Sequence, residues 1–227
     1  MSFFDSLQAA TSEERKTLFS VPVIRDALGG AVSLEGYIAF LTQAYYHVRH
    51  TAPLMMACGA RLPIRLEWLR KAVCEYIDEE YGHEQWILND IEACGGDPEK
   101  VRNGRPSLSI ELMVAFLYDT IQRGNPVGLF GMVNVLEGTS IALATHAAGS
   151  IRSSLGLPVT AFSYLSSHGE LDQEHMATYR SLMNRLEQPE DQDAVIHASK
   201  VVYGLYTDMF RGLPRAEVHA GVHHALV

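Results

Sequence analysis

Cysteine is scarce in this sequence. The three cysteines, Cys58, Cys74 and Cys94, are odd in number and widely spaced along 227 residues. A disulfide framework needs pairs of cysteines, and a CxxC metal site needs two that lie close together, so neither fits this chain. We therefore expect three reduced thiols in the protein core.

Basic residues are in the minority. The chain has 18 Lys and Arg against 27 Asp and Glu, which gives a net charge of −9. Nucleic acids and anionic membranes both require basic surface, so neither is expected as the main partner. No basic segment followed by a continuous apolar run opens the chain, so we expect no signal peptide, no membrane-spanning helix and a cytoplasmic location.

The sequence also lacks the alternation of polar and apolar residues that is typical of strands. Apolar residues recur at helical spacing instead, between breaks rich in glycine and proline. We predict an all-α fold of about seven helices in a single helical domain, residues 1–227, with a C-terminal tail of uncertain order over 212–227. A short helix opens the chain, and longer helices are predicted at residues 34–59 (kinked at Pro53), 64–93, 107–123, 127–153, 160–186 and 194–211.

Three potential metal ligands share one face of the helix predicted at residues 160–186. His168, Asp172 and His175 are four and three residues apart, which places them within about 60° of one another around the helix axis. Two imidazoles and one carboxylate suit a first-row cation such as iron or manganese. The alternative is a solvated polar face, because such neighbours are ordinary on exposed helices.

A second motif lies in the helix predicted at residues 64–93. Glu80 and His83 have the Glu-x-x-His spacing by which helical bundles direct a carboxylate and an imidazole at one metal, and Glu79 would serve almost as well. Gly82 stands beside the histidine. An interior glycine costs about 1 kcal/mol of helix stability, so we expect a reason such as close packing at this position.

The third candidate is an isolated acid. Glu137 is the only formally charged residue between Arg123 and Arg152. An ionised carboxylate among Val, Leu and Met would cost several kcal/mol unless it is paired or binds a metal. Glu137 therefore needs a partner, unless it stays protonated or meets an arginine.

Residues near these motifs are further candidates. His47 and His50 lie one turn apart and could ligate a metal, line a pocket or form structural hydrogen bonds. Arg49 or His50 could hold a substrate carboxylate. Tyrosine hydroxyls near the motifs could hydrogen-bond to ligands or transfer a radical, although tyrosines at helical spacing are more often core residues. These tyrosines are Tyr46, Tyr76 and Tyr81.

Together the three motifs supply a complete set of ligands. Three carboxylates and three imidazoles are the number that two metals need if they share a bridging carboxylate inside a helical bundle. Such a site leaves open positions for O2. We therefore expect two irons per chain, with manganese or no metal as alternatives. The six ligands would be Glu80, His83, Glu137, His168, Asp172 and His175.

These residues resemble a known family, the haem-oxygenase-like diiron oxidases and oxygenases. The resemblance rests on the Glu-Glu-x-Gly-His segment from Glu79 to His83, on Glu137, and on the block from His168 to His175, and it extends over about residues 34–210. It implies the seven-helix fold shared with TenA and PqqC proteins, a diiron site bridged by Glu137, and an O2-activating oxidoreductase. Some members place the first carboxylate two turns before the histidine, where this chain has Tyr76.

The same resemblance suggests three alternatives. TenA enzymes use a nucleophilic cysteine expected on the fourth helix, where this chain has none. A PqqC-like oxidase would work without metal, and an interaction protein could retain this scaffold without activity. Our prediction remains an enzyme that takes O2 and a small organic substrate, which the sequence does not identify. The abundance of apolar helical surface favours a homodimer.

Overall fold

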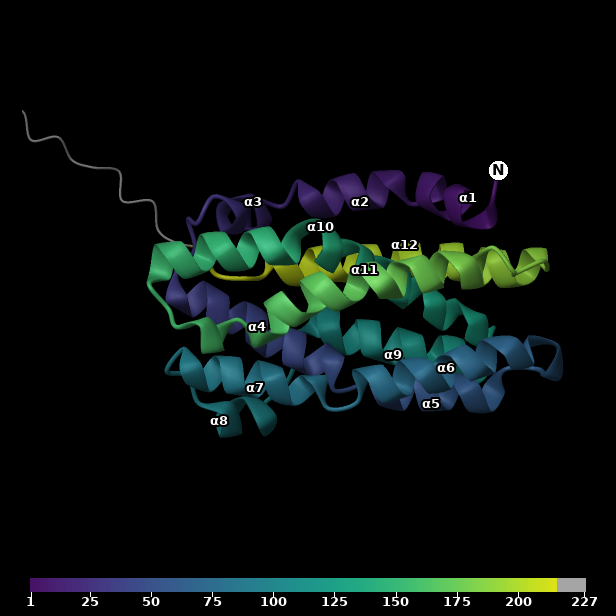
Figure 1. Ribbon diagram of the computed structural model, residues 1–227, viewed down its shortest axis with the longest axis horizontal. Coiled ribbons are helices and arrows are strands. Elements are labelled where there is room, and N and C mark those ends of the chain that lie inside the picture. Colours follow the sequence, from purple (N-terminus) through teal and green to yellow (C-terminus); the bar gives the residue numbers. More distant parts are fainter. Residues whose placement is uncertain (216–227) are drawn as a thin grey trace, which may run out of the picture.

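A computed structural model describes residues 1–215, apart from the side chains of 168–174, and residues 216–227 lie outside the description. The described chain contains twelve α-helices, three 3₁₀ helices and no strand. Most helices lie along one long axis (Figure 1). The α-helices are α1 (Phe3–Ala10), α2 (Ser12–Phe19), α3 (Pro22–Leu28), α4 (Leu34–Val48), α5 (Thr51–Arg61), α6 (Glu67–Glu80), α7 (His83–Ala93), α8 (Pro98–Arg102), α9 (Leu108–Arg123), α10 (Leu129–Leu155), α11 (Ser163–Met183) and α12 (Pro189–Arg211). The 3₁₀ helices are η1 (Ile64–Leu66), η2 (Pro126–Gly128) and η3 (Val159–Ala161).

The all-α class is confirmed, but there are more helices than predicted because two long helices are broken. The helix expected at 34–59 divides into α4 and α5 at Arg49 and His50. Pro53 lies in the first turn of α5, where its missing N–H removes no helical hydrogen bond. The helix expected at 64–93 divides into η1, α6 and α7, with Tyr81 and Gly82 between the last two.

The core is built around α10, which packs against both α11 and α12. Gly131 permits the close approach to α12. A Cβ atom at this position would lie 2.6 Å from the Ser199 nitrogen and 2.7 Å from the Val195 carbonyl oxygen. Because both neighbours are backbone atoms, no side-chain rotation could relieve the clash, and only glycine fits.

The segment Pro126–Leu155 is long and apolar enough to cross a membrane by length and composition. Its most apolar window has a mean hydropathy of 1.5, yet 67% of that window is buried inside the protein. A helix in the core of a folded domain has the same composition. The segment is therefore weak evidence for a membrane protein.

The start of α11 is fixed by a residue from α7. The buried carboxylate of Asp90 accepts hydrogen bonds from the backbone nitrogens of Ser163 (3.0 Å) and Tyr164 (2.9 Å), and from the Ser163 hydroxyl. Burial raises the pKa of Asp90, and these hydrogen bonds oppose the rise. A carboxylate at this position satisfies N–H groups that have no partner within the helix. Asp90 thus fixes the residue at which α11 begins. It thereby helps to position His175, which lies on the same helix.

The chain after α12 packs against the domain as far as it is described. Leu213 is buried in the core, and the Arg215 Nε lies 2.7 Å from the Asp26 carboxylate. The predicted tail therefore begins with ordered residues, 212–215. Residues 216–227 lie outside the described part of the chain.

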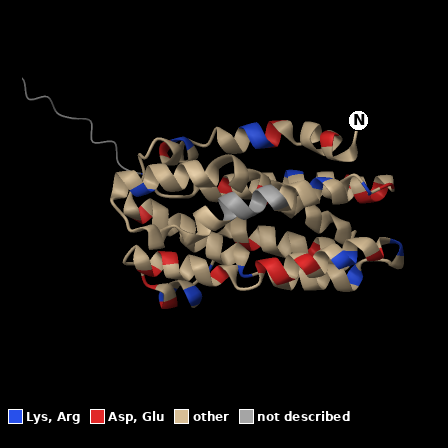
Figure 2. Cartoon of the chain, in the orientation of Figure 1, with Lys and Arg blue, Asp and Glu red and all other residues tan. Residues whose placement is uncertain are grey.

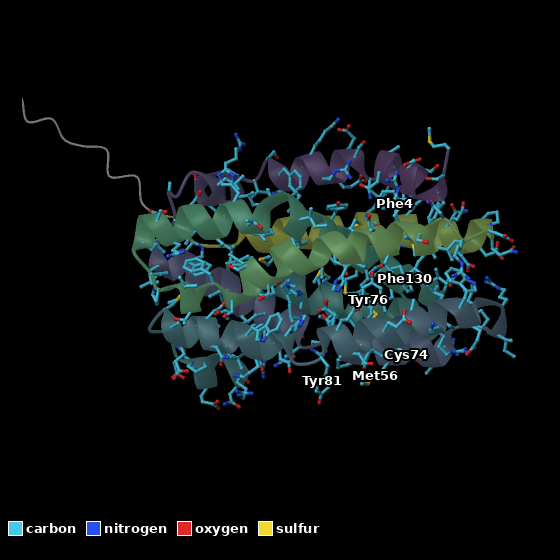
Figure 3. The ribbon with its side chains drawn as sticks, in the orientation of Figure 1. Phe4, Met56, Cys74, Tyr76, Tyr81 and Phe130 are labelled. Atoms are coloured by element: carbon cyan, nitrogen blue, oxygen red, sulfur yellow. The ribbon has the colours of Figure 1, made fainter. Side chains whose placement is uncertain are left out.

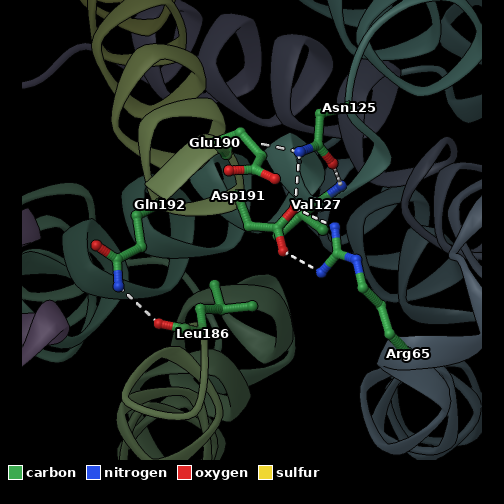
Figure 4. A network of polar contacts seen from close by, with 7 residues as sticks. All are labelled: Arg65, Asn125, Val127, Leu186, Glu190, Asp191 and Gln192. Atoms are coloured by element: carbon green, nitrogen blue, oxygen red, sulfur yellow. Dashed lines mark hydrogen bonds and ion pairs between the residues drawn. The ribbon is translucent and has the colours of Figure 1, made fainter. Parts of the chain in front are cut away.

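A polar network ties η1 to the start of α12 (Figure 4). The guanidinium of Arg65 donates two hydrogen bonds to Asp191, at 2.5 and 3.0 Å. The Nδ2 of Asn125 donates a third hydrogen bond to Asp191, at 2.8 Å. The Asp191 side chain is 1% exposed, whereas that of Arg65 is 45% exposed.

Candidate metal centre

The C-terminal end of α6 concentrates negative charge. Glu75, Asp78, Glu79 and Glu80 fall in its last six residues, and its last turn has no basic residue. Figure 2 shows Asp and Glu gathered along this helix. The carbonyl end of a helix carries a partial negative charge, so carboxylates there are destabilised. A bound cation would relieve this repulsion.

The break between α6 and α7 positions the two residues of the Glu-x-x-His motif. Gly82 has a φ of 93°, which is left-handed, and a Cβ atom there would meet nothing within 4 Å. The expectation that Gly82 serves close packing is therefore wrong. Its role is conformational, because other residues rarely adopt this backbone geometry. Glu80 ends α6 and His83 begins α7.

Glu80, Glu137 and His175 converge from α6, α10 and α11. One donor atom from each lies within 4.8 Å of the others, and all three side chains are buried. The His175 Nδ1 is 3.7 Å from Glu137 Oε1 and 3.9 Å from Glu80 Oε1. Metal–ligand bonds of about 2.1 Å separate opposite donors by about 4.2 Å. Small rotations would therefore bring these donors onto one ion.

The second oxygen of Glu80 contacts His83. The His83 Nδ1 lies 3.1 Å from Glu80 Oε2, and its ring stacks on Trp86 with centroids 3.9 Å apart. Glu80 therefore lies between two imidazoles. Glu79 also contacts His175, with its Oε2 3.1 Å from Nε2, but its side chain is 53% exposed against 9% for Glu80. Burial thus distinguishes Glu80 from its neighbour.

Two predicted ligands cannot be placed. His168 and Asp172 lie among residues 168–174, whose side chains fall outside the description. Their helix is held against α10 next to the centre by Tyr179, which follows His175 by one turn. The Tyr179 hydroxyl donates to the Phe130 carbonyl oxygen at 2.8 Å.

Tyr76 and His47 lie beside this cluster and line an internal cavity that also reaches Glu80 and Glu137. Tyr76 is labelled in Figure 3. Its ring is tilted against that of His175, with centroids 5.7 Å apart. Its buried hydroxyl has no hydrogen-bond partner among the described residues. Burial, with the nearby Glu137 carboxylate, raises the Tyr76 pKa, so the phenol stays protonated. His47 is buried with its ring edge-on to Tyr206.

A sequence model for a family described as iron-containing redox enzyme matches residues 38–206 of the chain. This range includes every residue of the cluster. The chain belongs to the iron-containing redox enzyme family. No curated protein sequence matches it.

Solved structures confirm the haem-oxygenase-like fold of this family member. A domain of unknown function from Shewanella denitrificans with a haem oxygenase-like fold is 23% identical, with a TM-score of 0.80 over 92% of this chain and 90% of that chain. A TenA homologue from Pseudomonas syringae is 11% identical, with a TM-score of 0.77 over 92% and 90%. Haem oxygenase from Leptospira interrogans is 18% identical, with a TM-score of 0.74 over 94% and 100%. At these identities the likeness concerns the fold alone.

Four predicted site residues of this family member lie elsewhere, outside the described lining of the cavity. The Tyr46 hydroxyl donates to the Val101 carbonyl oxygen, and Arg49 lies over the Tyr46 ring. His50 Nδ1 is 3.3 Å from the Tyr118 hydroxyl. Tyr81 is 75% exposed. Helical spacing placed all four near the motifs. Tyr46 instead contacts α8 from within α4, and the helix breaks at Arg49 and after Glu80 direct the other three away from the centre.

The two buried thiols of the chain, Cys58 and Cys94, are poorly suited to nucleophilic catalysis. Burial raises the pKa of Cys58 to about 12 and, with a smaller contribution from Asp90, that of Cys94 to about 11. A thiol reacts as the thiolate, and these two remain protonated at neutral pH. Cys74 is exposed on α6, so the expectation of three core thiols is wrong for this residue.

Two hydroxyl groups near the centre were not predicted from the sequence. Thr139 and Ser140 line the cavity just after Glu137, and their hydroxyls are buried with no hydrogen-bond partner among the described residues. Buried polar groups normally have a partner. The sequence feature that could have indicated them is the presence of two adjacent hydroxyl residues in a helix otherwise rich in apolar side chains.

Replacing Gly82 should damage the centre through the backbone. We expect Gly82→Ala to lower the free energy of unfolding by about 1–2 kcal/mol, because alanine resists a left-handed conformation, and to weaken metal binding by displacing Glu80 from His83. Chemical denaturation and metal titration measure the two effects. Gly149→Ala is the matched control, since Gly149 is helical, exposed and open, and alanine there should stabilise the protein by up to about 1 kcal/mol. Equal responses of the two variants would contradict this role of Gly82.

Proposed function

We propose that this protein is a non-haem iron oxidoreductase that uses O2 to oxidise a small organic substrate. The convergence of Glu80, Glu137 and His175, buried at one end of an internal cavity, carries the proposal. Membership of the iron-containing redox enzyme family supports iron as the metal. The donor set of carboxylate and imidazole suits that choice.

The residues present fit a metal ion on electrostatic grounds. Two buried carboxylates lie together at the end of a helix whose dipole disfavours them. Such an arrangement is costly without a cation, because desolvated like charges repel. Iron, when bound, supplies the redox chemistry with O2 that side chains lack.

The protein's own groups have separate tasks in this proposal. Glu80 and Glu137 balance the charge of the cation, and the contact of Glu80 with His83 Nδ1 orients that imidazole. Apolar walls from α4, α10 and α12 keep bulk water from the reacting atoms. Tyr76 lines the same cavity, and its protonated hydroxyl has no partner among the described residues, so it can donate a hydrogen bond to a group bound beside the carboxylates.

We further propose two irons per chain, with His83, His168 and Asp172 completing the ligand set around a bridging Glu137. This finer assignment rests on the ligand count and on the resemblance to the diiron oxidases. Manganese is the alternative metal. A homodimer and a cytoplasmic location complete the proposal.

Metal analysis tests this function. After anaerobic loading with Fe(II) and removal of free metal, we expect close to two irons per chain and a change in the visible spectrum when O2 is added. His175→Ala should lower the iron content sharply. His146→Ala is the matched control, because His146 is exposed on α10 and should leave the content unchanged.

Each alternative predicts a different result. A chain that takes up no iron but binds a quinone-like substrate would support a metal-free, PqqC-like oxidase and overturn the proposal. A chain that binds neither iron nor a quinone-like substrate, but forms a stable complex with another protein, would point to an interaction protein. One iron per chain would retain the redox enzyme and exclude the dinuclear site.

A further inference from the structure

The cavity that reaches Glu137 continues far beyond it along α10. One face of the helix lines it from Met132 to Ile151, and the lining residues recur at helical spacing. From Glu137 to Ile151 the helix rises about 21 Å. The cavity therefore extends well beyond the metal centre.

The two ends of the cavity differ in chemistry. Glu80 and Glu137 are the only Asp, Glu, Lys or Arg side chains among its described lining residues, and Glu137 lies nearer the end lined by Met132 than the end lined by Ile151. The partnerless hydroxyls of Tyr76, Thr139 and Ser140 lie near the same end. These five residues form the polar end of the cavity.

The other end is apolar. On α10 its lining consists of Leu143, Ala144, Ala147 and Ile151. Aromatic rings of α4 and α12 contribute the opposite wall. At this end α4 packs closely against the chain after α12, since a Cβ atom on Gly36 would lie 2.9 Å from the Pro214 carbonyl oxygen.

We propose that this cavity binds an amphiphile with a long aliphatic chain, its polar head beside Glu137, Thr139 and Ser140 and its tail along α10 as far as Ile151. The inference rests on the proposed function for the role of the head, because it names the substrate class of that centre. The tail site stands on the cavity alone.

Length and narrowness favour a chain over a compact ring. The cavity has a volume of only about 150 Å³, yet its lining follows α10 from Met132 to Ile151, so the space is long and narrow. A compact ring would leave much of a 21 Å apolar wall uncovered. A flexible chain covers it, and each buried methylene strengthens binding about threefold to fourfold.

A chain-length series tests the tail site in the wild-type protein without metal. Octanoic, dodecanoic and hexadecanoic acids should displace a fluorescent polyene fatty acid with rising affinity, by about 80-fold or more from the first to the second. Dodecanol and dodecylamine, compared with dodecanoic acid, identify the head group. Equal affinity for octanoic and dodecanoic acids, or tighter binding of naphthalene than of dodecanol, would overturn the proposal.

A blocking variant places the tail. Ala147→Phe fills the cavity about 15 Å along α10 from Glu137. We expect it to abolish the preference for dodecanoic over octanoic acid while leaving metal content and unfolding temperature unchanged. Ala142→Phe, on the exposed face of the same helix, should retain the preference. Retention of the preference in Ala147→Phe would contradict the proposed path of the tail.

The two proposals fail independently. If iron loads normally but no chain binds, the redox enzyme stands and the aliphatic substrate is rejected. If chains bind with the expected length dependence but no iron loads, the tail site stands and the oxidoreductase is rejected.

Discussion

Glu137→Gln should abolish tight metal binding without unfolding the protein. The change removes one negative charge and preserves the shape of the side chain. A glutamine carbonyl balances no positive charge, so we expect affinity for Fe(II) or Mn(II) to fall by about 100-fold or more, beyond the 10–100-fold typical of groups that only support ligands. Metal titration followed by calorimetry measures the loss directly.

The stability of the same variant provides a second measurement. Without metal, the change is expected to preserve or raise stability, although it weakens metal binding. Without metal, Glu137→Gln should unfold at no lower a temperature than the wild type, because it relieves repulsion from Glu80. With metal at about 100 times the wild-type Kd, the wild type should gain about 2.7 kcal/mol that the variant lacks.

Glu92→Gln is the control for both measurements. Glu92 is an exposed glutamate on α7, so its replacement should change neither metal affinity nor stability appreciably. Wild-type metal affinity in Glu137→Gln would remove Glu137 from the centre and, with it, the main support for the proposed function.

The isolation of Glu137 in an apolar segment is a property of one helix, and sequence alone was sufficient to indicate it. A single charge in that segment predicted burial, and the structure places Glu137 there with 9% of the residue exposed. The proximity of Glu80 to His83 is also local, since the two residues are three apart. Such features depend on helical spacing and composition, which the sequence displays directly.

The breaks in the helices were harder to predict because they depend on small backbone preferences. Arg49 and His50 interrupt a segment that otherwise forms a helix well, and neither is a strong breaker. Gly82 gave a readable signal, but a glycine in a helical pattern fits either close packing or a left-handed break. The consequences were large, because these breaks direct Arg49, His50 and Tyr81 away from the centre.

The cavity could not be predicted at all from periodicity. Its walls come from α3, α4, α5, α6, α10, α11 and α12, so its shape depends on how helices distant in sequence pack together. Thr139 and Ser140 become candidate site residues only because that packing buries their hydroxyls beside the cavity. A hydroxyl on a helix is ordinary until the tertiary structure buries it without a partner.

Arg65→Met should destabilise the protein by about 3 kcal/mol at pH 7, far from the metal centre. The variant leaves the carboxylate of Asp191 buried, with Asn125 as the remaining hydrogen-bond donor from a side chain among the described residues. An uncompensated buried charge costs about 3–5 kcal/mol. Because Asn125 still donates a hydrogen bond to the Asp191 carboxylate, we expect a cost at the lower end of this range. Urea denaturation measures the difference.

Arg102→Met is a closely matched control. The side chains of Arg65 and Arg102 are both 45% exposed, but the partner of Arg102, Glu99, is 68% exposed where Asp191 is 1% exposed. Loss of the exposed pair should cost less than about 1 kcal/mol. A similar loss in both variants would show that burial of the partner is unimportant.

The dependence on pH separates buried charge from lost packing. Burial alone would raise the pKa of Asp191, but hydrogen bonds from Arg65 and Asn125 hold it below its usual value. This stabilisation is therefore present above about pH 4 and is lost as the pH falls through the native pKa. In Arg65→Met, burial dominates and Asp191 takes up a proton more readily, so the penalty should shrink as the pH is lowered towards about 3. A penalty that stays constant with pH would mean that the arginine contributes through its apolar stem.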